Sequence, residues 1–183
     1  DDKPGPILET VLKPLWAAYR TMTRAREKRG PLDLDLPERK IILDSKGMVA
    51  DVTVPERLDA HRLIEEMMIA ANVAAAETLE QHRTPLLYRV HDSPSPEKLL
   101  ALREFLSSLN LSFSKTDAVR PVDFNRVLGK ARSDGKIEQV SEMVLRSQAQ
   151  AEYSAENYGH FGLNLDRYAH FTSPIRRYAD LIV

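Results

Sequence analysis

The sequence contains 183 residues, of which 43% are hydrophobic, and its 26 Lys and Arg side chains nearly balance 27 Asp and Glu side chains. This length and hydrophobic content predict one folded domain spanning residues 1–183. No run approaches the roughly 18 uninterrupted apolar residues that cross a bilayer, so we expect no membrane partner. Because there is no cysteine, disulfides and thiolate metal sites are excluded, which suits a cytoplasmic protein.

The net charge of −1 does not indicate a nucleic-acid-binding protein, which usually presents a basic face. Basic residues are nevertheless concentrated in two places, so local patches remain compatible with RNA. We interpret the first group as a solvent-exposed helix face in preference to a binding patch. The groups are Arg20, Arg24, Arg26, Lys28 and Arg29 near the start, and Arg167, Arg176 and Arg177 near the end.

Apolar residues recur every three or four positions over residues 7–29, which predicts an amphipathic helix. Pro14 lies inside this pattern, where proline either bends a helix or marks its true start. Gly30 and the proline after it are typical of a helix end. The sequence therefore predicts one long helix that stops at Gly30.

Leucines alternate with Asp33 and Asp35 over residues 32–36, which predicts a half-buried strand with its acids facing outward. Two aspartates in this spacing suggest a cation site. Two carboxylates alone are few for Mg²⁺, however, so we favour the solvent-facing interpretation. Residues 39–54 then predict a β-hairpin that turns at Gly47.

Residues 57–81 form the second predicted helix, whose middle is apolar except for Asn72. A helix that is apolar nearly all round is expected to be buried. Positions i, i+4, i+7 and i+11 share one stripe of a helix, and here they are His61, Glu65, Met68 and Asn72. Buried polar groups need partners, so this stripe either faces an RNA channel or forms an internal hydrogen-bond network. Glu66 points elsewhere, and we expect it to be structural.

The second half of the chain predicts a short strand over residues 84–90, followed by helices over residues 96–110, 122–130 and 137–149. His91 follows the strand, and we interpret it as loop structure because no second histidine lies at metal-ligand spacing. Together these elements predict an α+β fold that is mainly helical and contains a small antiparallel sheet.

Aromatic residues alternate with glycines over residues 158–162, shortly after Tyr153. Aromatic rings in this setting stack on bases while the backbone approaches closely, or they fill the core beside a tight turn. Tyr153 and His160 are accordingly candidate RNA contacts. We also expect His160 and His170 to orient the turn formed by residues 173–177.

Ser173 is a preferred helix N-cap and is followed by proline, so the sequence predicts a helix that begins there. Arg176 and Arg177 would then lie in the first turn, where the helix dipole favours anions over cations. A phosphate bound there would resolve this conflict. Thr172, Ser173 and Arg177 are therefore candidate phosphate contacts. The alternative is an ordinary ion pair between Arg176 and Asp180.

Residues 159–181, GHFGLNLDRYAHFTSPIRRYADL, closely resemble the signature of the ribonuclease R / ribonuclease II family. Three upstream segments agree with that family in the same order, at residues 29–38, 60–72 and 88–92. The resemblance covers nearly the whole chain, and it is closer to ribonuclease R than to ribonuclease II.

This resemblance implies a processive 3′-to-5′ exoribonuclease that acts on the 3′ end of single-stranded RNA and releases nucleoside 5′-monophosphates with the help of Mg²⁺. It implies a catalytic role for Arg176, as a cation facing the phosphate, and for Glu65, which matches a position bordering the cleavage site. The aspartates that bind the metal in the family lie in an earlier segment, and Asp33 and Asp35 do not match it. We therefore expect no metal ligand in this chain.

The resemblance also implies a fragment of a larger mixed α/β catalytic domain, without the upstream aspartate segment and the flanking RNA-binding domains. We expect such a fragment to be inactive by itself and its parent to be cytoplasmic; no protein partner is indicated. The alternatives are a non-catalytic module that binds RNA or phosphate, and a folded core without a ligand.

Overall fold

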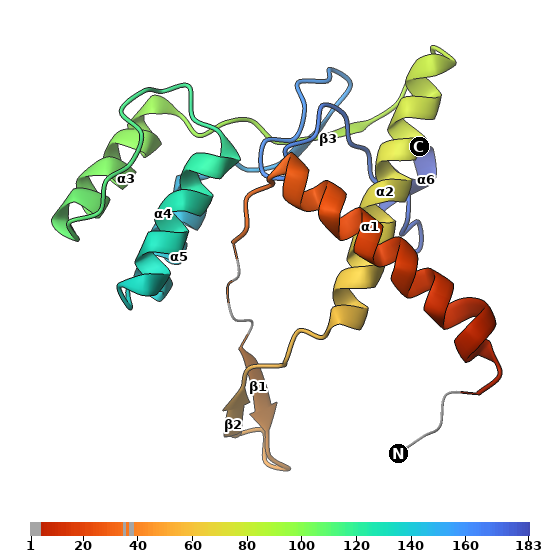
Figure 1. The fold of residues 1–183 in the computed structure, drawn as a ribbon, viewed down its shortest axis with the longest axis horizontal. Coiled ribbons are helices and arrows are strands. Elements are labelled where there is room, and N and C mark those ends of the chain that lie inside the picture. The colour runs from red at the N-terminus through yellow and green to blue at the C-terminus, as the bar shows by residue number, and fades with distance from the viewer. Residues whose placement is uncertain (1–4, 35, 37–38) are drawn as a thin grey trace.

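The structure is a computed structural model that describes residues 5–34, 36 and 39–183 (Figure 1). It confirms the predicted α+β class, because helices dominate and the strands form two small antiparallel pairs, β1 with β2 and β3 with β4. The elements are a π-helical turn η1 (Leu8–Leu12), α1 (Lys13–Arg29), β1 (Lys40–Leu43), β2 (Val49–Thr53), α2 (Asp59–Gln81), β3 (Tyr88–Val90), α3 (Pro96–Ser108), α4 (Pro121–Ser133), α5 (Ile137–Ser147), β4 (Glu152–Ser154) and α6 (Tyr178–Ile182).

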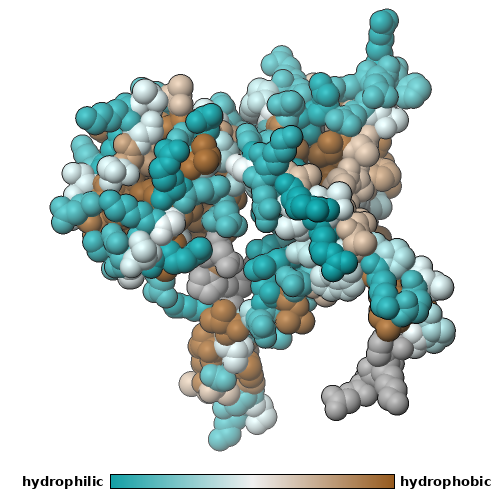
Figure 2. Space-filling model, viewed as in Figure 1, coloured by the Kyte–Doolittle hydropathy of each residue, from teal (hydrophilic) through white to brown (hydrophobic). Residues whose placement is uncertain are grey.

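Helices α3, α4 and α5 gather into one lobe, while α1 crosses α2 on the other side of the molecule (Figure 1). The β1–β2 hairpin projects away from both. Figure 2 shows hydrophobic side chains gathered on this hairpin. Ile41 and Val52, which face each other across it, are 58% and 50% exposed.

The main hydrophobic core lies in the α3–α5 lobe and follows the predicted helical spacing of the leucines in α3. Helix α3 begins as predicted, with the Ser95 side chain accepting a hydrogen bond from the Lys98 N–H. The fully buried members of this core are Leu99, Leu102, Leu106, Phe124, Ala131, Val140 and Val144.

Helix α1 ends where the sequence predicts, because Gly30 adopts the left-handed conformation with φ of 65° and its N–H donates to the Arg26 carbonyl. Pro14 marks the start of the regular α-helix and does not bend its middle. The residues before it, Leu8–Leu12, form the π-helical turn. A proline in the first helical turn costs no hydrogen bond, since N–H groups there have no partner in the helix.

The predicted strand over residues 32–36 is wrong for the described part of that segment, and Asp35 lies outside it. Residues 31–34 are irregular, because their polar backbone groups meet single distant partners and no neighbouring strand. The Leu32 N–H donates to the Gly162 carbonyl (2.8 Å), and the Asp33 N–H donates to Asn125 Oδ1 (2.8 Å). The alternation itself holds, since Asp33 is exposed and Leu32 packs against the α3–α5 core.

Helix α2 is not buried all round, contrary to the prediction. Its buried residues form a single face, which comprises Leu63, Glu66, Ile69, Asn72 and Ala76. Ile64, on the other side, is 55% exposed. Glu66 is structural as predicted, because its carboxylate pairs with Arg26 of α1 at 2.7 Å and joins the two helices.

The loop of residues 159–165 connects the two sides of the molecule. Phe161 packs against the α3–α5 core, while the Leu163 carbonyl accepts a hydrogen bond from Arg29 Nε of α1 (3.0 Å). The Gly162 N–H donates to His91 Nδ1 (2.8 Å), and a Cβ atom at Gly162 would lie only 2.9 Å from that nitrogen. Glycine is therefore required at this close approach.

Among the residues that the structure describes, no helix is long and apolar enough to cross a membrane.

Candidate phosphate-contact site

The predicted helix start at Ser173 is wrong, because α6 begins only at Tyr178. Residues 174–176 form a turn in which the N–H groups of Arg176 and Arg177 both donate to the Ser173 carbonyl, each at 3.2 Å. Arg177 then adopts an extended backbone conformation, with φ of −135° and ψ of 119°, which separates this turn from α6. The turn is thus no helix N-terminus, and the dipole argument for an anion at Ser173 does not apply.

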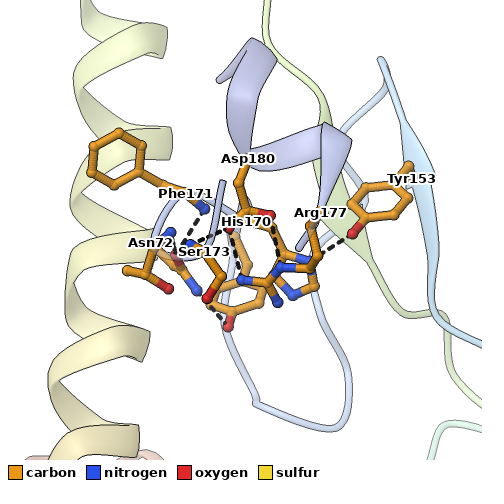
Figure 3. Close-up of polar contacts among 9 residues, drawn as sticks. Asn72, Tyr153, His170, Phe171, Ser173, Arg177 and Asp180 are labelled. Carbon is orange, nitrogen blue, oxygen red and sulfur yellow. Dashed lines mark hydrogen bonds and ion pairs between the residues drawn. The ribbon is translucent and has the colours of Figure 1, made fainter. Parts of the chain in front are cut away.

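Asp180 of α6 holds the turn from one side (Figure 3). Its side chain is buried, and Oδ1 accepts hydrogen bonds from the Ser173 N–H and from the Arg177 guanidinium, both at 2.7 Å. The other carboxylate oxygen lies 2.7 Å from Arg177 Nε. Although burial alone raises the pKa of this carboxyl, the bonds from Arg177 and Ser173 outweigh it and hold the pKa of Asp180 below its ordinary value.

The predicted ion pair between Arg176 and Asp180 is therefore wrong, since the partner is Arg177. The arginine three residues before Asp180, and not the one four residues before it, reaches the carboxylate because the extended backbone at Arg177 turns its side chain back toward α6. Arg177 is consequently engaged inside the protein, with a side chain that is 19% exposed.

Asn72 of α2 holds the same segment from the other side (Figure 3). This residue is only 2% exposed, and its Oδ1 accepts hydrogen bonds from the N–H groups of Phe171 (2.9 Å) and Thr172 (3.2 Å). Its Nδ2 donates to the Tyr168 hydroxyl (2.9 Å). Asn72 thus forms the internal network that was one of the two predicted alternatives, and its geometry assigns it to positioning the loop.

The hydrogen bonds of Asn72 and Asp180 leave the Arg176 side chain exposed to solvent. The backbone N–H groups of Phe171, Thr172 and Ser173 are all used by Asn72 and Asp180, so they are not available to a phosphate. Arg176 is exposed, and within the described residues its guanidinium has no hydrogen-bond or ion-pair partner. The Thr172 hydroxyl is buried and likewise has no partner in the described part of the chain.

The polar stripe of α2 faces a recess of about 340 Å³, which confirms that its four residues share one face. Glu65 and Asn72 meet Arg177 and Tyr168 across this recess. The lining residues are His61, Ile64, Glu65, Met68, Ile69, Asn72, Tyr168 and Arg177. Residues that are about a hundred positions apart in the sequence, from α2 and from the end of the chain, are thus brought together.

Glu65 and His61 both line this recess but make different contacts. The Glu65 side chain is 39% exposed and pairs with Arg57, which precedes α2. His61 Nδ1 accepts a hydrogen bond from the Leu58 N–H (3.1 Å) and so satisfies one of the free N–H groups at the start of α2. Glu65 therefore remains accessible, whereas the His61 bond is structural.

Tyr153 and His160, both predicted RNA contacts, occupy different places. Tyr153 lies on β4, is 40% exposed, and its hydroxyl hydrogen-bonds to His170 Nδ1 (2.8 Å), which connects it to the 170–177 loop (Figure 3). His160 packs between His91 and Tyr168 and accepts a hydrogen bond from the Leu163 N–H (3.2 Å). Burial, followed by the neighbouring His91, lowers the pKa of His160 to about 4. His160 thus orients the 159–165 loop and not the predicted 173–177 turn.

The described residues do not fit a Mg²⁺ site. Glu65 is the one carboxylate that lines the recess, and it already pairs with Arg57. Within the described ranges, no group of three His, Asp or Glu side chains is placed to hold a metal ion. Mg²⁺ ordinarily needs several oxygen ligands in near-octahedral geometry.

A family model described as the RNB domain matches residues 2–183. The chain belongs to the RNB-domain family. Ribonuclease R of Vibrio parahaemolyticus is 41% identical over 176 residues, a match that covers 96% of this chain and 21% of that protein. The chain therefore spans about a fifth of the length of this RNB-domain relative. The sequence resemblance to the ribonuclease R / ribonuclease II family is thereby confirmed.

Two solved structures have folds similar to that of this chain. The structure of Mycoplasma genitalium RNase R in complex with ribose methylated single-stranded RNA matches with a TM-score of 0.89 and 30% identity, over 99% of this chain and 28% of that one. Yeast Ssd1, described as a pseudonuclease, matches with a TM-score of 0.59 and 25% identity, over 69% of this chain and 16% of that one.

Proposed function

We propose that this RNB-domain chain is the phosphate-contacting part of a 3′-to-5′ exoribonuclease that releases nucleoside 5′-monophosphates from the 3′ end of single-stranded RNA. The observation that carries the proposal is the exposed Arg176, presented on a loop whose backbone is fixed by Asn72 and Asp180. The relationship to ribonuclease R supports the same reaction class.

In this proposal Arg176 faces the scissile phosphate. Phosphodiester hydrolysis concentrates negative charge on the phosphate oxygens in the transition state, and a fixed guanidinium stabilises that charge with two parallel N–H donors. A cation stabilises the transition state best when it is held in place before the reaction. Asn72 and Asp180 provide this by holding the loop on both sides of Arg176, so they are positioning residues.

Glu65 has the second proposed role, at the mouth of the recess. Its half-exposed carboxylate pairs with Arg57, which fixes its orientation, and it lies on the same recess as Arg177. We assign it to orienting the terminal nucleotide through hydrogen bonds. Ser173, through its hydroxyl, and Tyr153 are proposed RNA contacts of the same loop and its neighbour β4. Thr172 is not included, because its N–H is bound to Asn72 and its hydroxyl is buried.

We propose that the expected metal is bound outside the described residues. When bound, Mg²⁺ supplies an activated water and stabilises the leaving oxygen. We propose that carboxylates beyond the described residues hold it, since the side chains around the recess do not fit such a site. The residues described here then bind and orient the phosphate.

The proposal is tested by RNA binding of the purified chain, followed by fluorescence anisotropy of a labelled single-stranded RNA in a salt series. We expect salt-sensitive binding that weakens in Arg176→Ala and is partly restored in Arg176→Lys, because lysine keeps the charge but not the bidentate geometry. Lys115→Ala removes the same charge from an exposed loop and serves as the matched control. Equal weakening in both alanine variants would refute a specific role of Arg176.

The catalytic part is tested in the longer protein that carries this domain. Arg176→Ala should lower kcat for release of mononucleotides by a factor on the order of a hundred or more, as for the loss of one group that stabilises transition-state charge. Glu65→Gln should affect kcat less than Arg176→Ala. A longer protein that binds RNA but releases no mononucleotides with Mg²⁺ present would overturn the enzymatic proposal.

A second candidate function is a non-catalytic RNA-binding module. The similarity to yeast Ssd1 supports this candidate, because a protein described as a pseudonuclease has a similar fold. The outcome just described, binding without mononucleotide release, is the result expected for this candidate.

A further inference from the structure

The basic cluster at residues 20–29 divides into two groups in the folded chain. Arg26 and Arg29 turn inward, Arg26 to the Glu66 carboxylate and Arg29 to the Leu163 carbonyl. Arg20, Arg24 and Lys28 are exposed. At 100° per residue these three lie within one narrow stripe of α1, on the side opposite to Arg26 and hence away from α2. We call them the α1 basic stripe.

The α1 basic stripe is unfavourable for the helix that carries it. Arg24 lies four residues after Arg20 and four before Lys28, and like charges at this spacing repel each other. Within the described residues none of the three has a carboxylate partner; Arg24 reaches only the Thr21 hydroxyl. Lys28 is in the last turn, where the helix dipole favours a cation, but Arg20 and Arg24 are in the middle of α1.

Some other exposed helical arginines of the same chain are paired in the ordinary way, although Arg132 of α4 is exposed and has no ion pair among the described residues. Arg126 faces Asp123 in α4, and Arg146 faces Glu142 in α5. Helix α1 instead contains six basic residues against one acidic residue, a net charge of +5 in a chain whose net charge is −1. The one acid of α1, Glu27, lies three residues after Arg24 but forms no ion pair in the described part of the chain. Concentrated charge of one sign on one helix face, with so little compensation, indicates a partner of the opposite sign.

We propose that the α1 basic stripe is a second RNA-contact surface, which binds the backbone phosphates of a single strand away from its 3′ end. Successive stripe residues rise by about 6 Å along the helix, which is comparable to the distance between neighbouring phosphates of an extended strand. The exposed Ala25, between Arg24 and Lys28, and the exposed Ala17, three residues before Arg20, leave the long basic side chains unobstructed. This inference rests on the proposed RNA function and adds a surface separate from the Arg176 loop.

The test compares two triple variants of the chain in the same salt series. The stripe variant is Arg20→Ala/Arg24→Ala/Lys28→Ala. The control variant is Arg126→Ala/Lys130→Ala/Arg146→Ala, which removes the same charge from exposed positions of α4 and α5. Alanine favours helix, so both variants should stay folded, as circular dichroism and thermal unfolding will verify.

The stripe variant should bind single-stranded RNA more weakly, and its slope of log K against log salt should be smaller in magnitude by about 2, from roughly 0.7 for each of three lost phosphate contacts. The control should keep the slope of the unmodified chain. Equal loss in both variants, or unchanged binding in the stripe variant, would overturn the inference. So would absence of RNA binding by the unmodified chain.

Two further comparisons separate this inference from its alternatives. If polyglutamate competes as well as RNA of equal charge, an acidic protein surface is the better partner and the RNA assignment fails. The stripe and the proposed function also fail separately. If Arg176→Ala loses RNA binding and the stripe variant does not, only the stripe inference is overturned. If the stripe variant has a reduced slope but the longer protein releases no mononucleotides, only the enzymatic proposal is overturned.

Discussion

The α3–α5 lobe and the 170–177 loop are held in place by different kinds of interaction. In the lobe, leucine, valine and phenylalanine side chains from three helices pack into one core. In the loop, two buried polar side chains, Asn72 and Asp180, bind the backbone directly. Apolar packing is non-directional and tolerates small shifts, whereas hydrogen bonds fix atoms in particular positions. The loop therefore has the construction expected where a single cation must be placed accurately.

The largest expected effect lies in the lobe. Phe124 is fully buried between Phe113 and Phe161, whose ring centroids are 4.9 and 6.0 Å away. Phe124→Ala should lower the free energy of unfolding by about 4 kcal/mol, because it removes a large apolar side chain and leaves a cavity. Urea denaturation followed by circular dichroism measures this. A loss below about 1 kcal/mol would show that the lobe is not the main source of stability.

The next effect tests the polar anchor of the loop. Asp180→Ala leaves the Arg177 guanidinium and the Ser173 N–H without their acceptor, and should cost about 3 kcal/mol, the lower end for breaking a buried pair, since Arg177 keeps some contact with water. Asp180→Asn retains an acceptor for Ser173 and should cost less. RNA binding should fall together with stability only in the alanine variant. Equal stability of both variants would argue against a structural role for the charge.

Lowering the pH is expected to reduce the free energy of unfolding by a smaller amount. His160 accepts the Leu163 N–H through Nδ1, which it does only when that nitrogen carries no proton, and its pKa falls from 6.5 to about 4 on burial. Between these values the unfolded chain binds the additional proton, so the stability present above about pH 6.5 is lost as the pH falls toward 4. The contribution of His160 is on the order of 1–2 kcal/mol.

His160→Asn tests this, because its amide oxygen replaces Nδ1 as an acceptor without titrating. The variant should show a weaker dependence of unfolding free energy on pH across this window, although not none, since burial also lowers the pKa of His170 to about 4. His82→Asn, at an exposed position after α2, is the control. A pH dependence identical to that of the unmodified chain would contradict the assignment of His160 Nδ1 as an unprotonated acceptor.

The smallest effect on stability is expected at the mouth of the recess. The pair of Glu65 with Arg57 is 39% and 48% exposed, so Glu65→Gln should change the free energy of unfolding by less than about 1 kcal/mol. Its effect should appear in RNA affinity or turnover instead. Asp180 is thus an anchor that is costly to remove, whereas the exposed Glu65 has its proposed role toward the RNA and little role in stability.

Much of the fold was predictable because its signals are local. Helical periodicity placed the helices, Gly30 ended α1, and Ser95 capped α3, each through interactions within a few residues. The stripe of His61, Glu65, Met68 and Asn72 was also predictable, since four positions on one helix face need only the helix to exist. The family resemblance likewise came from the linear order of motifs.

Tertiary structure alone decided the details of the site. By local rules Ser173 and the proline after it form a good helix start, yet the turn ends at Arg177. Asp180 accepts a hydrogen bond from the Ser173 N–H and Asn72 accepts one from the Thr172 N–H, and these bonds outweigh the local helix propensity. The sequence spacing predicted Asp180 only as a partner for Arg176, although Asp180 also lies three residues after Arg177, a spacing at which side chains of a helix meet. The division of the basic cluster on α1 also depended on Glu66 and the Leu163 carbonyl, distant groups whose positions no local pattern specifies.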